Sequence, residues 1–241
     1  MFTYDAQIAA AVRTPAQTIA DVLERMRTID GICSGDADGL KWFNWLYLHV
    51  TEAVKARIDA GNFTDPAWMA DLDVKFANFY FEALCGYLTQ NNCPDCWRAL
   101  FSVRGDVRIA RIQFAMAGVN AHINHDLAEA IVATCSGGTM APVHGCAQYS
   151  DYTDLNSTLD SMIDMAETEL MVRLPRDPLP VVNHLEYVLA AWGTAAAREQ
   201  AWNNSETLWH LQNAPAIRDG FLQTLDGLAS FAGRTLLAPV P

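Results

Sequence analysis

The hydrophobic and polar positions of the chain repeat with the period of an α-helix, and no stretch shows the period of two that marks a strand. Start and stop signals, chiefly Pro near helix starts and Gly near helix ends, divide this pattern into segments. They predict helices at about 14–27, 40–60, 64–88, 94–101, 107–135, 151–171, 181–212 and 215–233. The sequence therefore predicts an all-α protein, a single-domain bundle of about eight helices over residues 1–241.

The segment from Val107 to Cys135 is the predicted centre of this bundle. It is apolar or small on almost every side, and such a helix is normally buried on all its faces. Buried polar groups cost free energy unless they are hydrogen-bonded. The middle of this segment nevertheless holds five polar side chains, namely Asn120, His122, Asn124, His125 and Asp126. Their clustering predicts a structural polar network, a hydrated pocket or a reactive site.

Length and charge narrow the class of protein. The 241 residues are 51% hydrophobic, enough for a sizeable core, and the net charge is −12. A negative surface repels nucleic-acid phosphates and anionic lipids, so we expect a small-molecule substrate rather than a nucleic acid or a membrane. The N-terminus lacks the basic region of a signal peptide, and no apolar run reaches about 18 residues. These features favour a cytoplasmic location.

The six cysteines are too dilute for a disulfide scaffold. Cys93 and Cys96 have the CxxC spacing of redox and zinc motifs, but no βαβ pattern accompanies them. Cys135 and Cys146 flank a Gly-rich loop and could pair in an oxidising compartment. We expect reduced thiols at helix ends.

Three other predicted helices carry stripes that mix aromatic and polar side chains on one face. Such stripes suit a ligand pocket between helices, although each one alone also fits ordinary core packing. Several in one small bundle favour a shared pocket. The side chains assigned to it are Asn44, Tyr47, Asp73, Tyr80, Arg198, Trp202 and Trp209.

His122 and Asp126 lie four residues apart, so both project from one helical face. Three interpretations stay open. Asp126 could orient His122 as a general acid or base, the two could be the first ligands of a metal such as zinc, or they could form a structural ion pair. Further metal donors could come from Asp73, His144, Asp154 and Asn156. His125 points in another direction and is expected to be a helix-surface or partly packed residue.

A minor interpretation concerns Asn156, Asp160 and Asp164, which lie four residues apart. Their four-residue spacing loosely resembles the magnesium ligands of class I terpene synthases, with Asp71 and Asp73 in place of the aspartate-rich motif. An acidic, solvated helix face explains the same spacing.

Nearly the whole chain resembles a bacterial family that is known only as a domain of unknown function. The most specific part is the NAHIN-x-DL stretch at 120–127. The other matching residues are Asp38, Gly39, Leu40, Phe43, Asn44, Tyr47, Thr51, Leu72, Asp73, Val74, Phe76, Ala77, Tyr80, Trp97, Arg98, Ala117, Gly118, Asp151, Tyr152, Asn156, Arg198, Ala201 and Trp202. The resemblance implies a single helical domain with its site at the polar positions of these motifs, and it implies no activity.

We expect a small-molecule enzyme without a redox cofactor, of the cyclase, isomerase or lyase type, acting on a largely apolar substrate. The expected catalytic residues are His122, Asp126, Asn120 and Arg198. The expected substrate-binding residues are Asn44, Tyr47, Asp73, Tyr80, Asn124 and Trp202. One alternative is a metal-dependent hydrolase with His122 and Asp126 as ligands, and another is a non-catalytic small-molecule-binding protein.

Overall fold

The computed structural model describes residues 2–33, 35–138, 140–170 and 193–239, and within these ranges the chain forms helices and no strand. The all-α prediction is confirmed. The helices are α1 (Asp5–Ala11), α2 (Ile19–Ile32), α3 (Leu40–Asp59), α4 (Pro66–Gln90), α5 (Asp95–Phe101), α6 (Arg111–Ala121), the π-helical turn η1 (His122–Asp126), α7 (Leu127–Gly138), α8 (Ala147–Asp154), α9 (Asn156–Leu170), α11 (Thr194–His210) and α12 (Pro215–Leu236).

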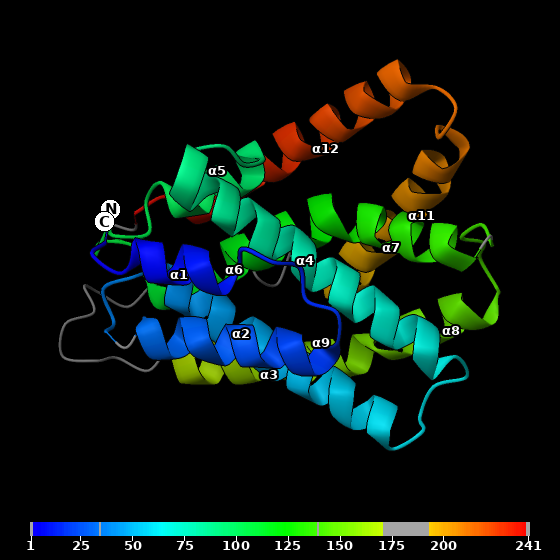
Figure 1. Cartoon of the computed structure of the whole chain (residues 1–241), viewed down its shortest axis with the longest axis horizontal. Helices are drawn as coiled ribbons and strands as arrows, with labels where there is room; N and C mark the ends of the chain where they lie inside the picture. Colours follow the sequence, from blue (N-terminus) through cyan, green and yellow to red (C-terminus); the bar gives the residue numbers. More distant parts are fainter. Residues whose placement is uncertain (1, 34, 139, 171–192, 240–241) are drawn as a thin grey trace.

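Helices α6 and α7, joined by η1, form one rod through the interior of the bundle (Figure 1). Helices α3 and α12 pack on its α6 half, whereas α4 and α11 pack on its α7 half. The turn η1 contacts α4, α11 and α12. The polar residues at the middle of the rod are therefore surrounded by helices from both ends of the chain.

The central rod differs from the prediction of one α-helix over 107–135. It begins at Arg111 because the Gln113 side chain accepts a hydrogen bond from the Ala110 backbone N–H at 2.9 Å and caps the first turn. Val107 lies in the preceding turn and is 72% exposed. The rod is also interrupted, since His122–Asp126 adopt the wider π-helical form. Single π-helical turns inside α-helices are frequent at functional sites.

Other helix boundaries also differ. The expected start at Thr14–Pro15 is wrong, because Thr18 and Asp21 form the capping box that begins α2. The segment predicted as one helix over 151–171 forms α8 and α9, and α1 was not predicted. The first part of the helix predicted over 181–212 lies outside the described residues, which resume before Thr194.

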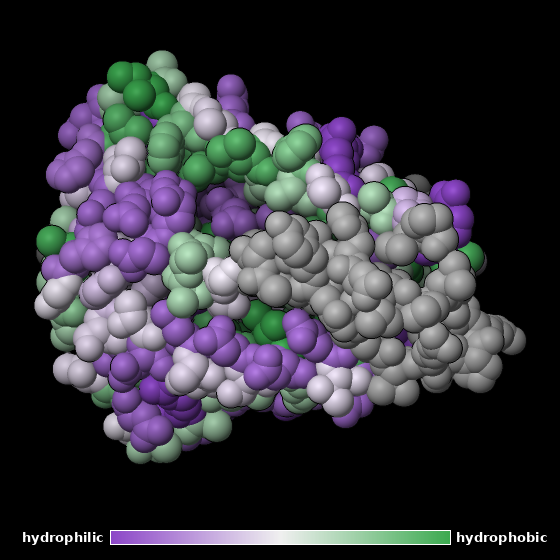
Figure 2. All heavy atoms as spheres, turned by 180° about the vertical axis from the view of Figure 1, so that it is seen from behind, coloured by the Kyte–Doolittle hydropathy of each residue, from purple (hydrophilic) through white to green (hydrophobic). Residues whose placement is uncertain are grey.

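The surface carries one exposed apolar strip along α12. Ile217, Leu228 and Phe231 are each more than 60% exposed, and Figure 2 shows hydrophobic side chains gathered along this helix on a largely hydrophilic face. Among the described helices, none combines the length and hydrophobicity that a membrane crossing requires.

Candidate functional site

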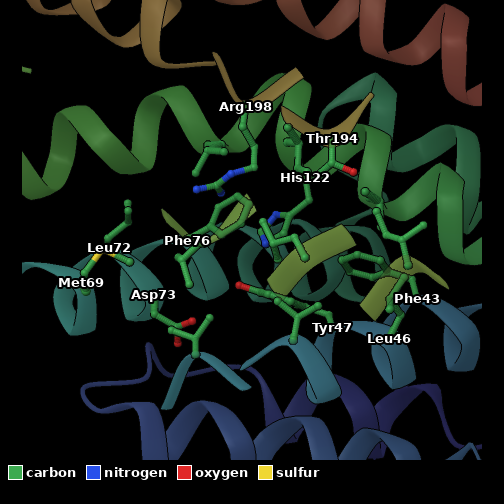
Figure 3. Close-up of a pocket in the computed structure, with 18 residues that line it drawn as sticks. Phe43, Leu46, Tyr47, Met69, Leu72, Asp73, Phe76, His122, Thr194 and Arg198 are labelled. Atoms are coloured by element: carbon green, nitrogen blue, oxygen red, sulfur yellow. The ribbon is translucent and has the colours of Figure 1, made fainter. Parts of the chain in front are cut away.

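A cavity of about 90 Å³ lies between α3, α4, α9, α11 and the central rod (Figure 3). Its wall is largely apolar and includes Phe43, Leu72, Phe76 and Ile123. Five polar side chains also line it, namely Tyr47, Asp73, His122, Thr194 and Arg198. One polar side chain from each of the three predicted stripes, Tyr47, Asp73 and Arg198, therefore reaches this cavity.

The buried carboxylate of Asp126 fixes the imidazole of His122 through the ring nitrogen Nδ1. This nitrogen lies 2.8 Å from Oδ2 of Asp126, and the same oxygen accepts a hydrogen bond from the Trp97 indole N–H at 3.0 Å. Oδ1 of Asp126 lies 2.7 Å from Nδ1 of His125. Burial opposes ionisation of Asp126, but the two imidazole contacts outweigh it and lower the carboxyl pKa. Because the ionised carboxylate only accepts hydrogen bonds, Nδ1 of each histidine carries the hydrogen.

The opposite nitrogen of the His122 ring is free to accept a proton. Burial lowers the pKa of His122, so the ring is neutral near pH 7 and its Nε2 carries a lone pair. No described residue hydrogen-bonds this buried Nε2. The ring is fixed in place by a parallel stack on Phe76, with 3.4 Å between ring centroids, and by an edge contact with Tyr47 at 4.6 Å.

Asp73 is the second titratable group of the cavity. Burial raises the pKa of its carboxyl from 3.8 to about 7, because water is excluded and no described group compensates the charge of its Oδ2. The Tyr47 hydroxyl is likewise buried without a partner in the described ranges. In Figure 3 the oxygens of Tyr47 and Asp73 and the nitrogens of His122 border the same space. A neutral base and a carboxyl acid near its pKa thus line one cavity.

Arg198 is held at the cavity wall by structural contacts. Its Nε donates to Asn156 Oδ1 at 2.8 Å and its Nη2 donates to the Tyr152 carbonyl at 2.6 Å. The guanidinium also stacks on the Tyr152 ring, 3.8 Å from the centroid. This anchoring fixes the cation in position beside an otherwise largely apolar space.

The amide side chains that were assigned to the site form hydrogen bonds within the bundle instead. Asn44 donates to the Met26 carbonyl at 2.9 Å and joins α3 to α2. Asn120 donates to the Ala229 carbonyl at 2.7 Å and accepts from Asn124 at 3.0 Å, which joins the central rod to α12. None of these three amides is among the residues that line the cavity.

Three aromatic residues assigned to the pocket also lie outside the cavity wall. Tyr80 packs against Phe43 and Trp97 in the core behind His122. Trp202 is buried against Tyr152 and donates to Glu206 at 3.2 Å. Trp209 packs with the apolar side chains between α7 and α11 rather than at the cavity.

Of the four donors expected to complete a metal site with His122 and Asp126, Asp73 shares the cavity with His122, whereas His144, Asp154 and Asn156 do not line it. His144 lies at the surface between Glu199 and Glu206, and Asn156 binds Arg198. Asp160 and Asp164 are exposed, which agrees with an acidic solvated face. All six cysteines are unpaired.

Sequence reasoning missed two residues of the polar cluster. Trp97 donates to Asp126 from α5, and the only available signal was its place in the family motifs. His125 was expected at or near the surface, yet it is 7% exposed. The Asp126 contact outweighs burial and raises the pKa of His125. Both histidines lie in the π-helical turn and contact the same carboxylate.

Comparison with curated proteins and with solved structures gave no match. A family model described as a family of unknown function, DUF5995, matches residues 19–239 and so includes α2 to α12 and the whole cavity. The chain belongs to this family, DUF5995, for which no function is known.

Proposed function

We propose that the chain is a small-molecule enzyme that works by general acid–base catalysis, with His122 as the base. The observation that carries the proposal is the buried Nε2 of His122, which lacks a partner among the described residues although Asp126 fixes the ring at its other nitrogen. Burying such an atom unpaired costs free energy, so natural proteins retain one where a ligand or a reaction uses it.

The roles of the cavity side chains follow from their protonation states. His122 would take a proton from the substrate through Nε2, and Asp126 would stabilise the resulting imidazolium across the 2.8 Å contact. Asp73, with a pKa of about 7, would return a proton at another position of the substrate. Burial raises the pKa of Asp73 and lowers that of His122, which reverses their ordinary order and suits the carboxyl as the acid and the imidazole as the base. Isomerase and lyase reactions need such a pair.

The substrate class follows from the cavity wall. The cavity of about 90 Å³ has room for a small reacting group. The apolar wall favours a hydrocarbon portion, and the Tyr47 hydroxyl and Arg198 would bind a carbonyl or carboxylate oxygen. We place this activity in the cytoplasm, with a small molecule as partner and no redox cofactor.

The proposal is tested by proton exchange in heavy water. Short-chain ketones, aldehydes and unsaturated acids are incubated with the protein, and loss of their C–H signals is followed by proton NMR. We expect exchange with at least one compound. We also expect His122→Gln to slow it about 10²–10⁴-fold, the usual contribution of a general base.

The matched control is His210→Gln, which alters an exposed histidine at the end of α11. It should exchange like the wild type. If compounds bind, as seen in NMR titrations, but exchange equally slowly with and without His122, the protein is a binding protein and the catalytic proposal is wrong.

A further inference from the structure

A second polar cluster lies on the far side of Asp126 from the cavity. One side-chain ligand atom from each of Cys96, His125 and Asp226 lies within 4.8 Å of the other two. The residues come from α5, η1 and α12, three elements far apart in the sequence, and none of them lines the cavity. Figure 1 shows α12 passing beside α5. The Asp226 carboxylate contacts the backbone at the start of that helix.

We propose that Cys96, His125 and Asp226 bind a zinc ion. A thiolate, an imidazole and a carboxylate form a donor set that zinc accepts, and three protein ligands leave a fourth position of its tetrahedron for water. Ligand atoms around zinc lie about 3.5 Å apart, given bonds of about 2.0–2.3 Å. Shifts of about 1 Å in the side-chain positions would therefore bring the three ligand atoms to the spacing that zinc requires.

The surroundings of His125 are those of a metal ligand. Its Nδ1 is held by Asp126 at 2.7 Å, which leaves Nε2 as the nitrogen available to the ion. A carboxylate behind a ligating imidazole fixes the ring orientation and makes the ligand more basic. The same carboxylate holds His122 at 2.8 Å, so the proposed zinc site and the proposed base share one orienting group.

The Asp226 carboxylate is fixed in position by the start of α5. It accepts hydrogen bonds from the backbone N–H of Asp95 at 2.9 Å and of Cys96 at 2.8 Å. Each carboxylate oxygen has a second lone pair, so the carboxylate can also face an ion. Cys96 is buried whereas Asp226 is partly exposed, which gives an ion a route from solvent on the Asp226 side.

The local charge also favours a cation. The pKa of His125 is raised by three nearby carboxylates, those of Asp126, Asp226 and Glu129. Among the lysines and arginines of the described ranges, only Arg218 pairs with one of these carboxylates, 3.0 Å from Glu129. Burial raises the pKa of the Cys96 thiol, so without an ion this sulfur is protonated. On binding, the thiol would release its proton to solvent and the thiolate would bond to zinc.

The test measures metal content and the spectrum of a cobalt derivative. Full-length protein, purified without chelator, is analysed by inductively coupled plasma mass spectrometry, and apoprotein is titrated with Zn²⁺ and Co²⁺. We expect one zinc per chain and a thiolate-to-cobalt charge-transfer band. Cys96→Ser should abolish the band, and His125→Gln should weaken zinc binding at least 100-fold.

Cys93→Ser is the matched control, because it removes the other thiol of the CxxC pair, which is not part of the cluster. It should keep both the band and the affinity. If a variant fails to fold, zinc protection of Cys96 from alkylation in the wild type gives the same answer. A folded wild type without band, affinity or protection would overturn the proposal, as would equal losses in Cys93→Ser.

Discussion

At the scale of single residues, Asp73 makes the stability of the protein depend on pH. Its carboxyl has a pKa of about 7 in the folded chain and 3.8 as the ordinary value. The folded state therefore binds a proton more tightly than the unfolded state, and this favours folding below about pH 4. The contribution is lost as the pH rises through about 7. At ~1.4 kcal/mol per tenfold change in proton affinity, the loss approaches about 4 kcal/mol.

Asp73→Asn should remove this dependence, because the amide has no charge to bury. We expect the variant to match the wild type near pH 4 and to exceed its free energy of unfolding by a few kcal/mol at pH 9. Urea denaturation across this range measures the difference. The control is Asp71→Asn, whose exposed carboxylate pairs with Lys75 at 2.7 Å. A difference between Asp73→Asn and wild type that stays constant with pH would show that Asp73 titrates normally.

Residue-scale chemistry was predictable only where a short spacing fixes the partner. The four-residue interval of His122 and Asp126 placed them together, and their contact at 2.8 Å agrees. Asn44 and Asn120 could not be assigned in this way. Their partners are backbone carbonyls of Met26 and Ala229, which only the packing of other helices brings near. A buried amide in a sequence therefore does not reveal whether it binds a ligand or a neighbouring helix.

At the scale of elements, a π-helical turn carries the groups that meet at the Asp126 carboxylate. Within this turn the imidazoles of His122 and His125 contact the two carboxylate oxygens, at 2.8 and 2.7 Å. Hydrophobic periodicity predicts only that this stretch is helical. The hydrogen-bond shift that makes one turn wider leaves no pattern in the sequence, so the turn was not predicted.

The contact of α6 with α3 depends on Gly118. A Cβ at this position would overlap the ring of Phe43, which lines the cavity and packs edge-on against His122 at 5.8 Å between centroids. We expect Gly118→Ala to cost about 1–3 kcal/mol of unfolding free energy, as overpacked cores do. The displaced ring should also change ligand binding at the cavity. Thermal denaturation and NMR titration measure these two effects.

Gly220→Ala is the control for Gly118→Ala. Gly220 also lies within a helix, α12, but a Cβ there meets no atom within 4 Å. Alanine should stabilise this helix by about 0.5–1 kcal/mol. If Gly118→Ala lowers the free energy of unfolding and Gly220→Ala raises it, the cost at Gly118 comes from the overlap with Phe43. Equal changes in the two variants would contradict the close packing of α6 on α3.

At the scale of the whole molecule, a buried ion network ties the N-terminus to the bundle. Arg104, between α5 and α6, donates to Asp38 at 2.8 and 2.9 Å and to Asp5 of α1 at 2.6 Å. Asp38 also accepts from the Tyr4 hydroxyl at 3.0 Å. The family match begins at residue 19, so α1 with Asp5 lies outside the matched region, whereas Asp38 and Arg104 lie within it. Sequence patterns placed no helix at α1, because seven residues give too short a periodic signal.

Arg104→Gln should therefore destabilise the chain strongly. Removing one partner of a buried ion pair costs about 3–5 kcal/mol, since the remaining carboxylates stay buried without a counter-charge. Arg108→Gln provides the control, because Arg108 pairs with Asp106 at 2.6 Å but its side chain is 72% exposed. Exposed pairs contribute about 0–1 kcal/mol. Chemical denaturation of both variants, with hydrogen exchange of the α1 amides, compares them. If the two substitutions cost the same, the network does not hold α1, and the attachment of this helix rests on the packing of Ile8 and Ala9 against the core.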